Sequence, residues 1–370
     1  MAYGGDDMRI CFIGPANSAH IVKWCTWFNN RGHETHVISF TPGEIQNTEI
    51  HLIDVGVDVN GSDVEKLKYL TTGSKIKQLV DEIRPDIVNV HYATSYGMAV
   101  ALGHINRYVL SVWGADIYDF PKKSFLHKCM LQYSLQKACW LFSTSKAMAV
   151  EAAKYTKKAF EITPFGVDID LFNPAKRDRK SDEKLIVGTV NGLSDKYGIK
   201  NILEAVSVIY KSNEVPIELR IAGKGPQEEE YHQYAKDLGI EDITIWLGFI
   251  SQEEAAKEWA NMDIALIPST LESESFGVSA IEAQACGTAT VISDIPGLME
   301  ATLPQKTSIV VERNDSEALA NAIIQLYKCP EKRTELGQNG REYVLKHYSI
   351  DRCFRNVEAL FIEYVKGKSK

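Results

Sequence analysis

Apolar positions along the chain alternate between short β-rich runs and longer runs with helical spacing. Residues 9–13 form the first apolar run, which ends at Gly14. In residues 19–31, apolar side chains recur at helical spacing, with Ser18 as the expected N-cap and Gly32 as the expected stop. The repeated order of strand, helix and strand predicts an α/β protein whose parallel sheets are covered by helices on both faces.

The same pattern predicts the remaining elements. In the first half, strands are expected at 35–40, 87–90, 108–112 and 141–144, and helices at 62–84, 124–137 and 146–155. In the second half, strands are expected at 185–190, 217–222, 243–247, 264–268, 289–293 and 308–311. Further helices are expected after Lys200, Pro226, Gly277, Ser316 and Lys332, and a capping box from Ser251 to Glu254 opens another.

A break in this rhythm predicts the domain organisation. The alternation stops at residues 165–174 and restarts after a polar stretch at 176–184. We therefore expect two Rossmann-like, doubly wound domains, residues 1–168 and 169–349, with a final helix within 350–370 packing back on the first domain. Because open parallel sheets bind ligands at the carboxyl ends of their strands, the two domains are expected to face a central cleft.

Composition narrows the class of protein. The 370 residues carry a formal charge of −8 and are 45% hydrophobic, which suits a globular protein and gives no field that attracts nucleic acid. No apolar run reaches the roughly 18 residues of a membrane span, and the polar start lacks a signal-peptide pattern. The seven cysteines include no C-x-x-C pair, so free thiols and a cytoplasmic location are expected.

The most informative stretch is residues 268–283, which runs from a strand end through a loop into a helix. Glu274 is expected just before the helix and Glu282 about two turns inside it. Exposed amides at the helix start suit a phosphate, and carboxylates suit the vicinal hydroxyls of a sugar or ribose. The alternative is that Glu274 only matches the helix dipole. The residues expected to supply amides are Phe276, Gly277 and Val278.

This stretch resembles the E-x7-E signature of the family 4 glycosyltransferases of the GT-B fold, with Glu274 and Glu282 at its ends. Five other stretches resemble motifs of the same family in the same order, so the likeness spans nearly the whole chain. They are RGHE at 31–34, PDIVNVH at 85–91, GVDIDLFNP at 166–174, AGKGP at 222–226 and the glycine and strand at 287–292.

The resemblance implies a role for each matching position. Glu274 would hold the sugar of the donor, Glu282 the ribose, and Lys196 the diphosphate, while main-chain groups near Phe249 and Ile250 would meet the base. Family members mostly retain the anomeric configuration and work without metal. The implied activity is transfer of a hexose or N-acetylhexosamine from a nucleotide-sugar to a saccharide or lipid-linked acceptor in surface polysaccharide synthesis. UDP is favoured as the nucleotide, with GDP left open.

Three departures from the family pattern bear on catalysis. Asn191 stands where the family usually has a basic residue, and Trp113 stands where it often has a histidine. Either Asp116 or the backbone is expected to take over the contacts of that histidine. The first-strand loop offers Gly14 without a second glycine. The remaining acceptor-side candidates are Asn17, His20 and His91. These departures keep a second hypothesis open, namely a catalytically inactive nucleotide-sugar binding or scaffold protein of the same fold.

Other signals are weaker. Asp168 and Asp170 form a D-x-D, but it lies in the linker, so neither a metal site nor a cofactor is expected. Glu228 stands where a dinucleotide fingerprint needs its third glycine, which disfavours a dehydrogenase. Residues 122–131 mix lysines with apolar side chains, which leaves open both a solvated helix and peripheral contact with the inner face of a membrane.

Overall fold

The computed structural model describes residues 7–56, 67–179 and 183–368. The chain divides into two compact units, of which the first is Met1–Phe165 with Cys353–Lys370 and the second is Gly166–Arg352. These divisions lie three residues from the boundaries expected from the sequence, after residues 168 and 349. The first unit is therefore built from two separate stretches of chain.

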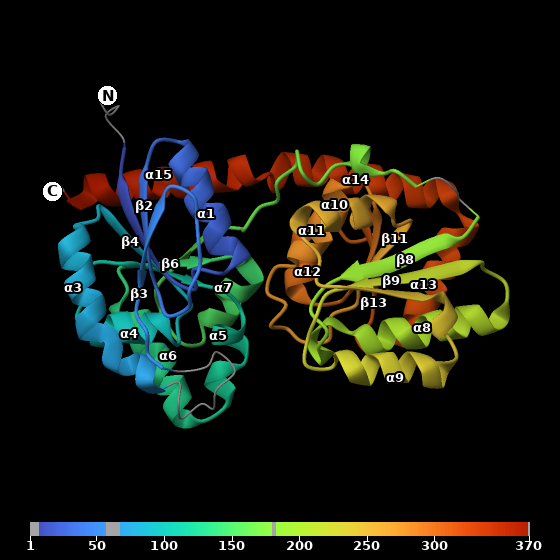
Figure 1. Cartoon of the computed structure of the whole chain (residues 1–370), viewed down its shortest axis with the longest axis horizontal. Coiled ribbons are helices and arrows are strands. Elements are labelled where there is room, and N and C mark those ends of the chain that lie inside the picture. The colour runs from blue at the N-terminus through green and yellow to red at the C-terminus, as the bar shows by residue number, and fades with distance from the viewer. Residues whose placement is uncertain (1–6, 57–66, 180–182, 369–370) are drawn as a thin grey trace. The chain divides into compact units, whose positions relative to one another are not determined.

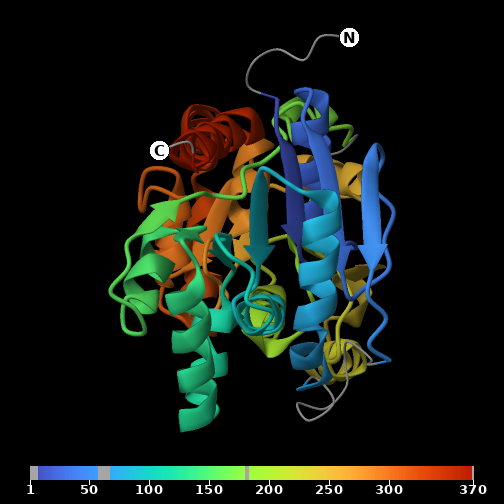
Figure 2. The same cartoon turned by 90° about the vertical axis from the view of Figure 1, so that its left-hand side faces the viewer.

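The first unit contains a parallel seven-stranded sheet of order β3-β2-β1-β4-β5-β6-β7 with helices on both faces (Figures 1 and 2). Its strands are β1 (Arg9–Ile13), β2 (Glu34–Ser39), β3 (Thr48–Leu52), β4 (Ile87–His91), β5 (Val109–Val112), β6 (Trp140–Ser143) and β7 (Phe160–Ile162). Its helices are α1 (Ala19–Asn30), α3 (Gly73–Ile83), α4 (Tyr96–Leu102), α5 (Ala115–Tyr118), α6 (Phe125–Lys137) and α7 (Lys146–Ala152), with 3-10 turns η1 (Leu67–Thr72) and η2 (Phe120–Lys122). The chain reverses its direction of travel across the sheet between β1 and β4, which makes this pair the switch point.

The second unit repeats the design with a parallel six-stranded sheet of order β10-β9-β8-β11-β12-β13 (Figure 1). Its strands are β8 (Leu185–Val190), β9 (Ile217–Ala222), β10 (Thr244–Gly248), β11 (Ile264–Ile267), β12 (Ala289–Ser293) and β13 (Ser308–Val311). Its helices are α8 (Ile199–Ser212), α9 (Glu228–Leu238), α10 (Gln252–Asn261), α11 (Val278–Ala285), α12 (Pro296–Ala301), α13 (Ser316–Lys328) and α14 (Pro330–His347), with 3-10 turns η3 (Pro174–Lys176), η4 (Asp195–Tyr197) and η5 (Glu241–Ile243). The switch point lies between β8 and β11. The expected fold of two doubly wound α/β domains is confirmed.

Helix caps account for several of the element starts. The Ser18 side chain accepts a hydrogen bond from a first-turn amide of α1, as expected, and Ser124 caps α6 in the same way. Ser251 and Glu254 form the complete capping box at the start of α10. Such caps satisfy amides that have no partner within the helix, so they fix where each helix begins.

The final helix, α15 (Ile350–Lys368), closes the core of the first unit. Phe354 and Phe361 pack on the rings of Trp24 and Phe28 at centroid distances of 5.2–6.4 Å. Glu358 joins the polar side of this contact, because its carboxylate takes two hydrogen bonds from Arg31 and one contact from His33 at 2.9 Å. Through these contacts residues 353–368 belong to the first unit.

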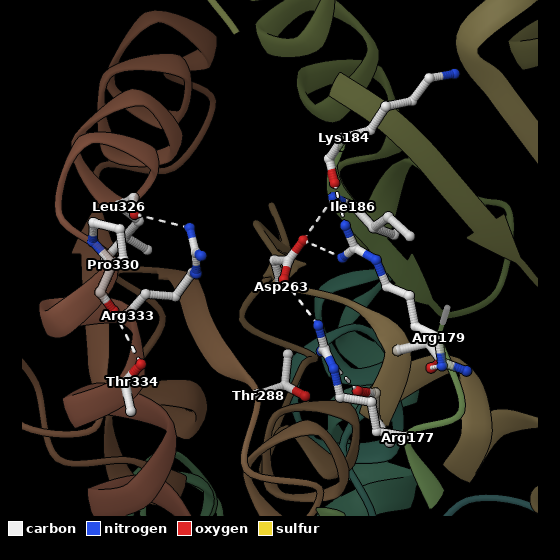
Figure 3. A network of polar contacts seen from close by, with 12 residues as sticks. Arg177, Arg179, Lys184, Ile186, Asp263, Thr288, Leu326, Pro330, Arg333 and Thr334 are labelled. Carbon is white, nitrogen blue, oxygen red and sulfur yellow. Dashed lines mark hydrogen bonds and ion pairs between the residues drawn. The ribbon is translucent and has the colours of Figure 1, made fainter. Parts of the chain in front are cut away.

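The linker is fixed to the second unit at the amino ends of its central strands. Arg177 and Arg179 converge on the carboxylate of Asp263, which also accepts the backbone amide of Ile186 at 2.9 Å (Figure 3). Asp263 precedes β11 and Ile186 lies in β8, so one carboxylate joins the linker to both central strands. The carboxyl ends of the strands remain for the functional site.

The structure differs from the sequence prediction at some elements. Strands β3 and β7 and helices α4 and α5 were not expected. The predicted helix 62–84 is replaced by η1 and α3 from residue 67 onward, and its residues 62–66 lie outside the described residues. Cys11, Cys25, Cys286 and Cys353 are buried free thiols, whereas Cys139 and Cys329 are exposed. None of the helices in the described ranges has the length and apolarity that a bilayer span requires.

Candidate functional site

The loop between β11 and α11 is held by a glycine at its end. Gly277 adopts φ +83°, a conformation that favours glycine, and a Cβ there would lie 2.5 Å from Leu298 Cδ2. Helix α11 starts at Val278, so the free amides of its first turn lie at the carboxyl end of the sheet. This is the arrangement that suits an anion.

Glu274 and Lys196, expected at one site, are brought together by the fold. Glu274 Oε1 accepts the amide of Gly277 at 3.1 Å, and Glu274 Oε2 lies 3.7 Å from Lys196 Nζ. Lys196 Nζ also donates to the carbonyl oxygen of Ser273 at 3.0 Å. We call Lys196 and Glu274 the charge pair. Their side chains are 27% and 14% exposed, so the lysine can reach a ligand while the carboxylate is largely covered.

Burial raises the pKa of Glu274, and the nearby Lys196 and the Gly277 amide only partly offset this effect. Glu274 accepts one amide and lies beside one ammonium group. Because a carboxylate has two acceptor oxygens, part of its hydrogen-bonding capacity remains. Such a group can accept from sugar hydroxyls.

Two other side chains of the predicted donor motif, those of Glu282 and Phe276, are buried. Glu282 is the fifth residue of α11, just over one turn inside rather than the expected two turns, because the helix begins at Val278. Its side chain is buried. The Phe276 ring is also buried and packs edge-on against Tyr348 at 5.2 Å, so only its main chain remains for a ligand.

Asn191, which follows β8, has a structural role that the sequence did not indicate. Its amide nitrogen donates to Thr189 Oγ1 at 3.0 Å, and its oxygen accepts from Ser279 Oγ at 2.7 Å. Ser279 lies in the first turn of α11, so Asn191 ties the end of β8 to that helix. Ile250 lies beyond the end of β10 and is partly buried.

The corresponding region of the first unit is mainly aromatic. The imidazole of His20 stacks on Phe165 at a centroid distance of 3.8 Å and packs against Trp113 in a T-shaped arrangement at 5.4 Å. Trp113 Nε1 donates to His91 Nδ1 at 3.2 Å. We call His20, His91, Trp113 and Phe165 the aromatic cluster. Phe165 is a member that the sequence prediction missed, because it lies at the far end of the unit's first stretch.

Burial lowers the pKa of both His20 and His91 to about 3, so both imidazoles are neutral near pH 7. Because Trp113 donates to His91 Nδ1, the proton of neutral His91 resides on Nε2. Within the described residues, His91 Nε2 and His20 Nδ1 are buried without a hydrogen-bond partner. Unpartnered buried polar atoms at the carboxyl end of a parallel sheet are candidates for ligand contacts.

The first-strand loop lies against this cluster. A Cβ on Gly14 would approach the Cβ of His91 to 3.2 Å, so glycine permits the close packing of the two strand ends. Asn17 is exposed, and its side-chain oxygen accepts from Thr41 Oγ1 at 3.1 Å. The structure therefore gathers Gly14 and His91 directly, with Asn17 farther along the loop.

Asp116, expected to be catalytic, is buried and accepts several main-chain hydrogen bonds. Its carboxylate takes the amides of Ala93, Trp113 and Gly114 at 2.8–3.4 Å. Burial raises its pKa and these amides oppose that effect. Asp116 thus joins the loops after β4 and β5, which positions Trp113, and its catalytic role stays a prediction.

The linker D-x-D is part of a turn. Asp168 Oδ1 accepts the amides of Asp170 and Leu171 at 3.0 and 3.1 Å. Among the described residues, one group of histidine and carboxylate side chains converges closely enough to hold a metal ion, and it lies in the first unit away from this turn.

The architecture of two parallel α/β sheets is that of the GT-B fold. Sucrose-phosphate synthase from Thermosynechococcus elongatus has the same fold, with a TM-score of 0.82 at 18% identity over 97% of this chain and 99% of its own. HepE from Anabaena, solved in complex with UDP and glucose, gives a TM-score of 0.79 at 17% identity over 95% of this chain and 99% of its own.

The sequence assigns the family. Residues 173–343 match the family described as glycosyl transferases group 1, and residues 9–145 match the family described as glycosyl transferase 4-like. The chain belongs to the group 1, family 4 glycosyltransferases. Among its relatives, N-acetyl-alpha-D-glucosaminyl L-malate synthase of Bacillus anthracis is 25% identical over 353 residues, 91% of each chain. The putative glycosyltransferase EpsD of Bacillus subtilis is 23% identical over 368 residues, 93% of each chain.

Proposed function

We propose that this glycosyltransferase moves a hexose or N-acetylhexosamine, with retention of anomeric configuration, from a UDP-sugar to a saccharide or lipid-linked acceptor in surface polysaccharide synthesis. The observation that carries the proposal is the charge pair beside the first turn of α11. Lys196 Nζ lies 3.7 Å from Glu274, and Glu274 accepts the amide of Gly277 at the end of the loop. A cation, free helix amides and a sugar-binding carboxylate in one place suit a sugar diphosphate.

The division of labour within the donor follows from this geometry. Lys196 and the amides around Gly277 and Val278 would hold the diphosphate, and Glu274 would accept hydrogen bonds from the sugar. Glu282, inside α11, would hold the ribose, and main-chain groups near Ile250 would meet the base. The HepE complex with UDP and glucose supports a UDP-linked donor, and the N-acetylglucosaminyl relative supports an N-acetylhexosamine.

The proposed mechanism needs no nucleophile from the protein. As the bond from the sugar to the diphosphate breaks, negative charge grows on the leaving oxygen, where a fixed lysine and helix amides stabilise it. The leaving diphosphate would accept the proton of the attacking acceptor hydroxyl on the same face, which retains the configuration. We propose that this transfer is independent of divalent metal, since cationic and amide groups of the chain carry the charge.

The acceptor is assigned to the aromatic cluster of the first unit. The faces of Trp113 and His20 suit the apolar face of a sugar ring, and the unpartnered nitrogens of His20 and His91 suit its hydroxyls. In α6 of the same unit, Phe125 and Leu126 are 81% and 66% exposed beside lysines 122, 123 and 128, which supports peripheral contact with an anionic membrane. Loss of sedimentation with anionic vesicles in Phe125→Ser/Leu126→Ser would be the expected result, and unchanged sedimentation would contradict that contact.

The test of the proposed function is a donor panel. The purified chain is incubated with UDP- and GDP-linked sugars and saccharide acceptors, free nucleoside diphosphate is measured, and the product linkage is determined by NMR. We expect turnover with a UDP-sugar, an unchanged anomeric configuration, and the same rate after treatment with a chelator. An inverted product, a preference for GDP, or activity that only added metal restores would each contradict the corresponding part of the proposal.

One observation favours a second candidate function, a nucleotide-sugar binding protein without turnover. Asn191 takes the place of a basic residue, and its side chain is engaged by Thr189 and Ser279. Of positions 191 and 196, only Lys196 would then supply a positive charge to the diphosphate. Nucleotide binding by calorimetry together with no product from any donor and acceptor pair would support this candidate.

A further inference from the structure

A cluster of two histidines and a glutamate lies on the first unit's sheet, outside the residues assigned to transfer. His36 lies on β2, and Glu49 and His51 lie on β3, the strand at the edge of the described sheet beside β2. The parallel register places His36 opposite Glu49 and Ile38 opposite His51. Because side chains alternate along a strand, these residues project from one face of the sheet and meet there.

The three side chains bring their ligand atoms close together. His36 Nδ1 lies 3.2 Å from His51 Nε2 and 3.5 Å from a carboxylate oxygen of Glu49, and His51 Nε2 lies 3.8 Å from the other oxygen. Two ligands of a tetrahedral zinc ion at bond lengths of about 2.0–2.1 Å are separated by about 3.3 Å. The observed distances therefore match the edges of a zinc coordination shell with little rearrangement.

A fourth side chain orients the first histidine. Glu34 Oε1 accepts the N–H of His36 Nε2 at 2.9 Å, and its other oxygen is paired with Arg9 Nε at 2.8 Å. When the proton of the His36 ring is on Nε2, the lone pair of Nδ1 is directed toward His51 and Glu49. A carboxylate that holds the distal N–H of a histidine is the usual support for a metal-bound imidazole.

We propose that His36, His51 and Glu49 form a zinc site that joins the edge strand β3 to β2. Two imidazoles and one carboxylate are a ligand set that zinc accepts, and the 67% exposed side chain of Glu49 leaves a position open to water. His36 and His51 are largely buried, with side chains 9% and 17% exposed, so little side-chain entropy remains to be lost on binding. The site lies apart from the residues assigned to transfer, since β1 and β2 lie between β3 and the strand that carries His91.

The competing explanation is a hydrogen bond in which His51 Nε2 donates to His36 Nδ1, with no metal. The test therefore measures metal binding directly, on the full-length chain carrying Cys139→Ser and Cys329→Ser so that exposed thiols do not bind zinc. The protein is stripped with a chelator, dialysed, and titrated with Zn²⁺ by calorimetry. Co²⁺ is then added as a probe, because its visible absorption reports tetrahedral coordination.

We expect one Zn²⁺ bound per chain, a tetrahedral Co²⁺ spectrum and a raised midpoint of thermal unfolding. His51→Gln should abolish the Co²⁺ spectrum, and Glu34→Gln should weaken zinc binding by roughly 10- to 100-fold, the usual effect of losing such a supporting carboxylate. His127→Gln, on α6, is the matched control and should bind as the parent does.

Several outcomes would overturn the proposal. These are the absence of saturable binding, an octahedral Co²⁺ spectrum, or equal affinity in His51→Gln and the parent. Should His51→Gln fail to fold, Glu49→Gln replaces it, because Glu49 is exposed and its amide preserves the shape while weakening the ligand. Chelation should lower thermal stability without changing turnover, so this result is distinguishable from failure of the proposed glycosyl transfer.

Discussion

The side chains at the carboxyl ends of the strands are charged in the second unit and mostly neutral and aromatic in the first. In the second unit, the charge pair keeps an ammonium and a carboxylate 3.7 Å apart beside the first turn of α11. In the first unit, the aromatic cluster holds two neutral histidines, and the nearby carboxylate of Asp116 accepts hydrogen bonds from main-chain amides. The same sheet geometry therefore presents a charged surface in one unit and a neutral aromatic surface in the other.

This difference indicates which substrate suits each unit: the nucleotide-sugar donor the second, and the acceptor the first. A diphosphate needs positive charge and free amides, which the second unit provides, whereas it gains nothing from neutral imidazoles. A sugar ring has one apolar face and several hydroxyls, which aromatic rings and single imidazole nitrogens match. Substitutions that move charge between the two surfaces are consequently the sharpest tests of this assignment.

Removal of the cation from the charge pair is expected to have the largest effect. Lys196→Ala should lower kcat at saturating donor by about a hundred- to a thousandfold, or about 2.7–4 kcal/mol, because charge on the leaving diphosphate grows in the transition state. Lys200→Ala, at an exposed position of α8, is the matched control and should retain turnover. Near-normal turnover in Lys196→Ala would show that other groups hold the diphosphate.

Asn191→Arg tests the same charged surface by adding a positive charge to it. If the residue lies beside the diphosphate, the new cation should tighten the binding of nucleoside diphosphate measured by calorimetry. Its hydrogen bonds to Thr189 and Ser279 would be lost, so thermal unfolding must be measured alongside. Unchanged affinity in a folded variant would place residue 191 outside the site.

In the first unit, removal of the buried Asp116 carboxylate should lower the stability of the fold. Asp116→Ala should lower the free energy of unfolding by about 2–3 kcal/mol, because three buried amides lose a charged acceptor. Asp116→Asn retains one oxygen and should cost less. Urea unfolding followed by tryptophan fluorescence is the measurement, since Trp24, Trp27, Trp113 and Trp140 all lie in this unit. A stable Asp116→Ala variant that loses only turnover would instead support the catalytic role.

The buried glutamate of α11 should act on nucleotide affinity. We expect Glu282→Ala to weaken nucleoside diphosphate binding by about 1.5–3 kcal/mol, the size of lost hydrogen bonds to a charged group. Glu342→Ala, on α14, serves as the control. Calorimetry decides, and an unchanged affinity in a folded Glu282→Ala protein would remove this residue from the ribose site.

The neutral histidines predict the pH dependence of stability. Burial lowers the pKa of His20 and His91 from 6.5 to about 3, so between these pH values the unfolded chain binds protons that the folded chain does not. Stability should therefore fall as pH falls from 6.5 toward 3, by up to about 1.4 kcal/mol per pH unit for each histidine. His91→Gln should flatten this slope in urea unfolding, while His127→Gln should leave it unchanged. Equal slopes in the two variants would mean that His91 is not held neutral.

The fold could be predicted where the local pattern agreed with the final structure. Helix starts at Ser18 and Ser251 were predicted because the capping side chain and its amide are close in sequence. Strand β3 was missed because its sequence, TEIHL, contains polar residues that only the pairing with β2 accommodates. Helix α4 was missed because Gly97 lies in it, and this glycine is needed where a Cβ would approach Ser134 Oγ to 2.7 Å.

The candidate site was predicted less evenly. The convergence of Glu274 and Lys196 followed from the family motifs, because both lie at strand ends of one sheet. The hydrogen bonds that Asn191 accepts from Ser279 and Asp116 accepts from Ala93 join segments that are far apart in the sequence, so no local pattern reports them. The meeting of His36 with Glu49 and His51 depends on the register between two strands, which the sequence prediction lacked because β3 was not expected.

Helix α15 also sets an order of events during synthesis of the protein. Residues 353–368 complete the first unit, yet they leave the ribosome only after the whole of the second unit has been made. Until then Trp24 and Phe28 lack the rings of Phe354 and Phe361, and Arg31 lacks the carboxylate of Glu358. The half that is translated first must therefore finish folding last, and its nascent form exposes an apolar surface that chaperones can bind.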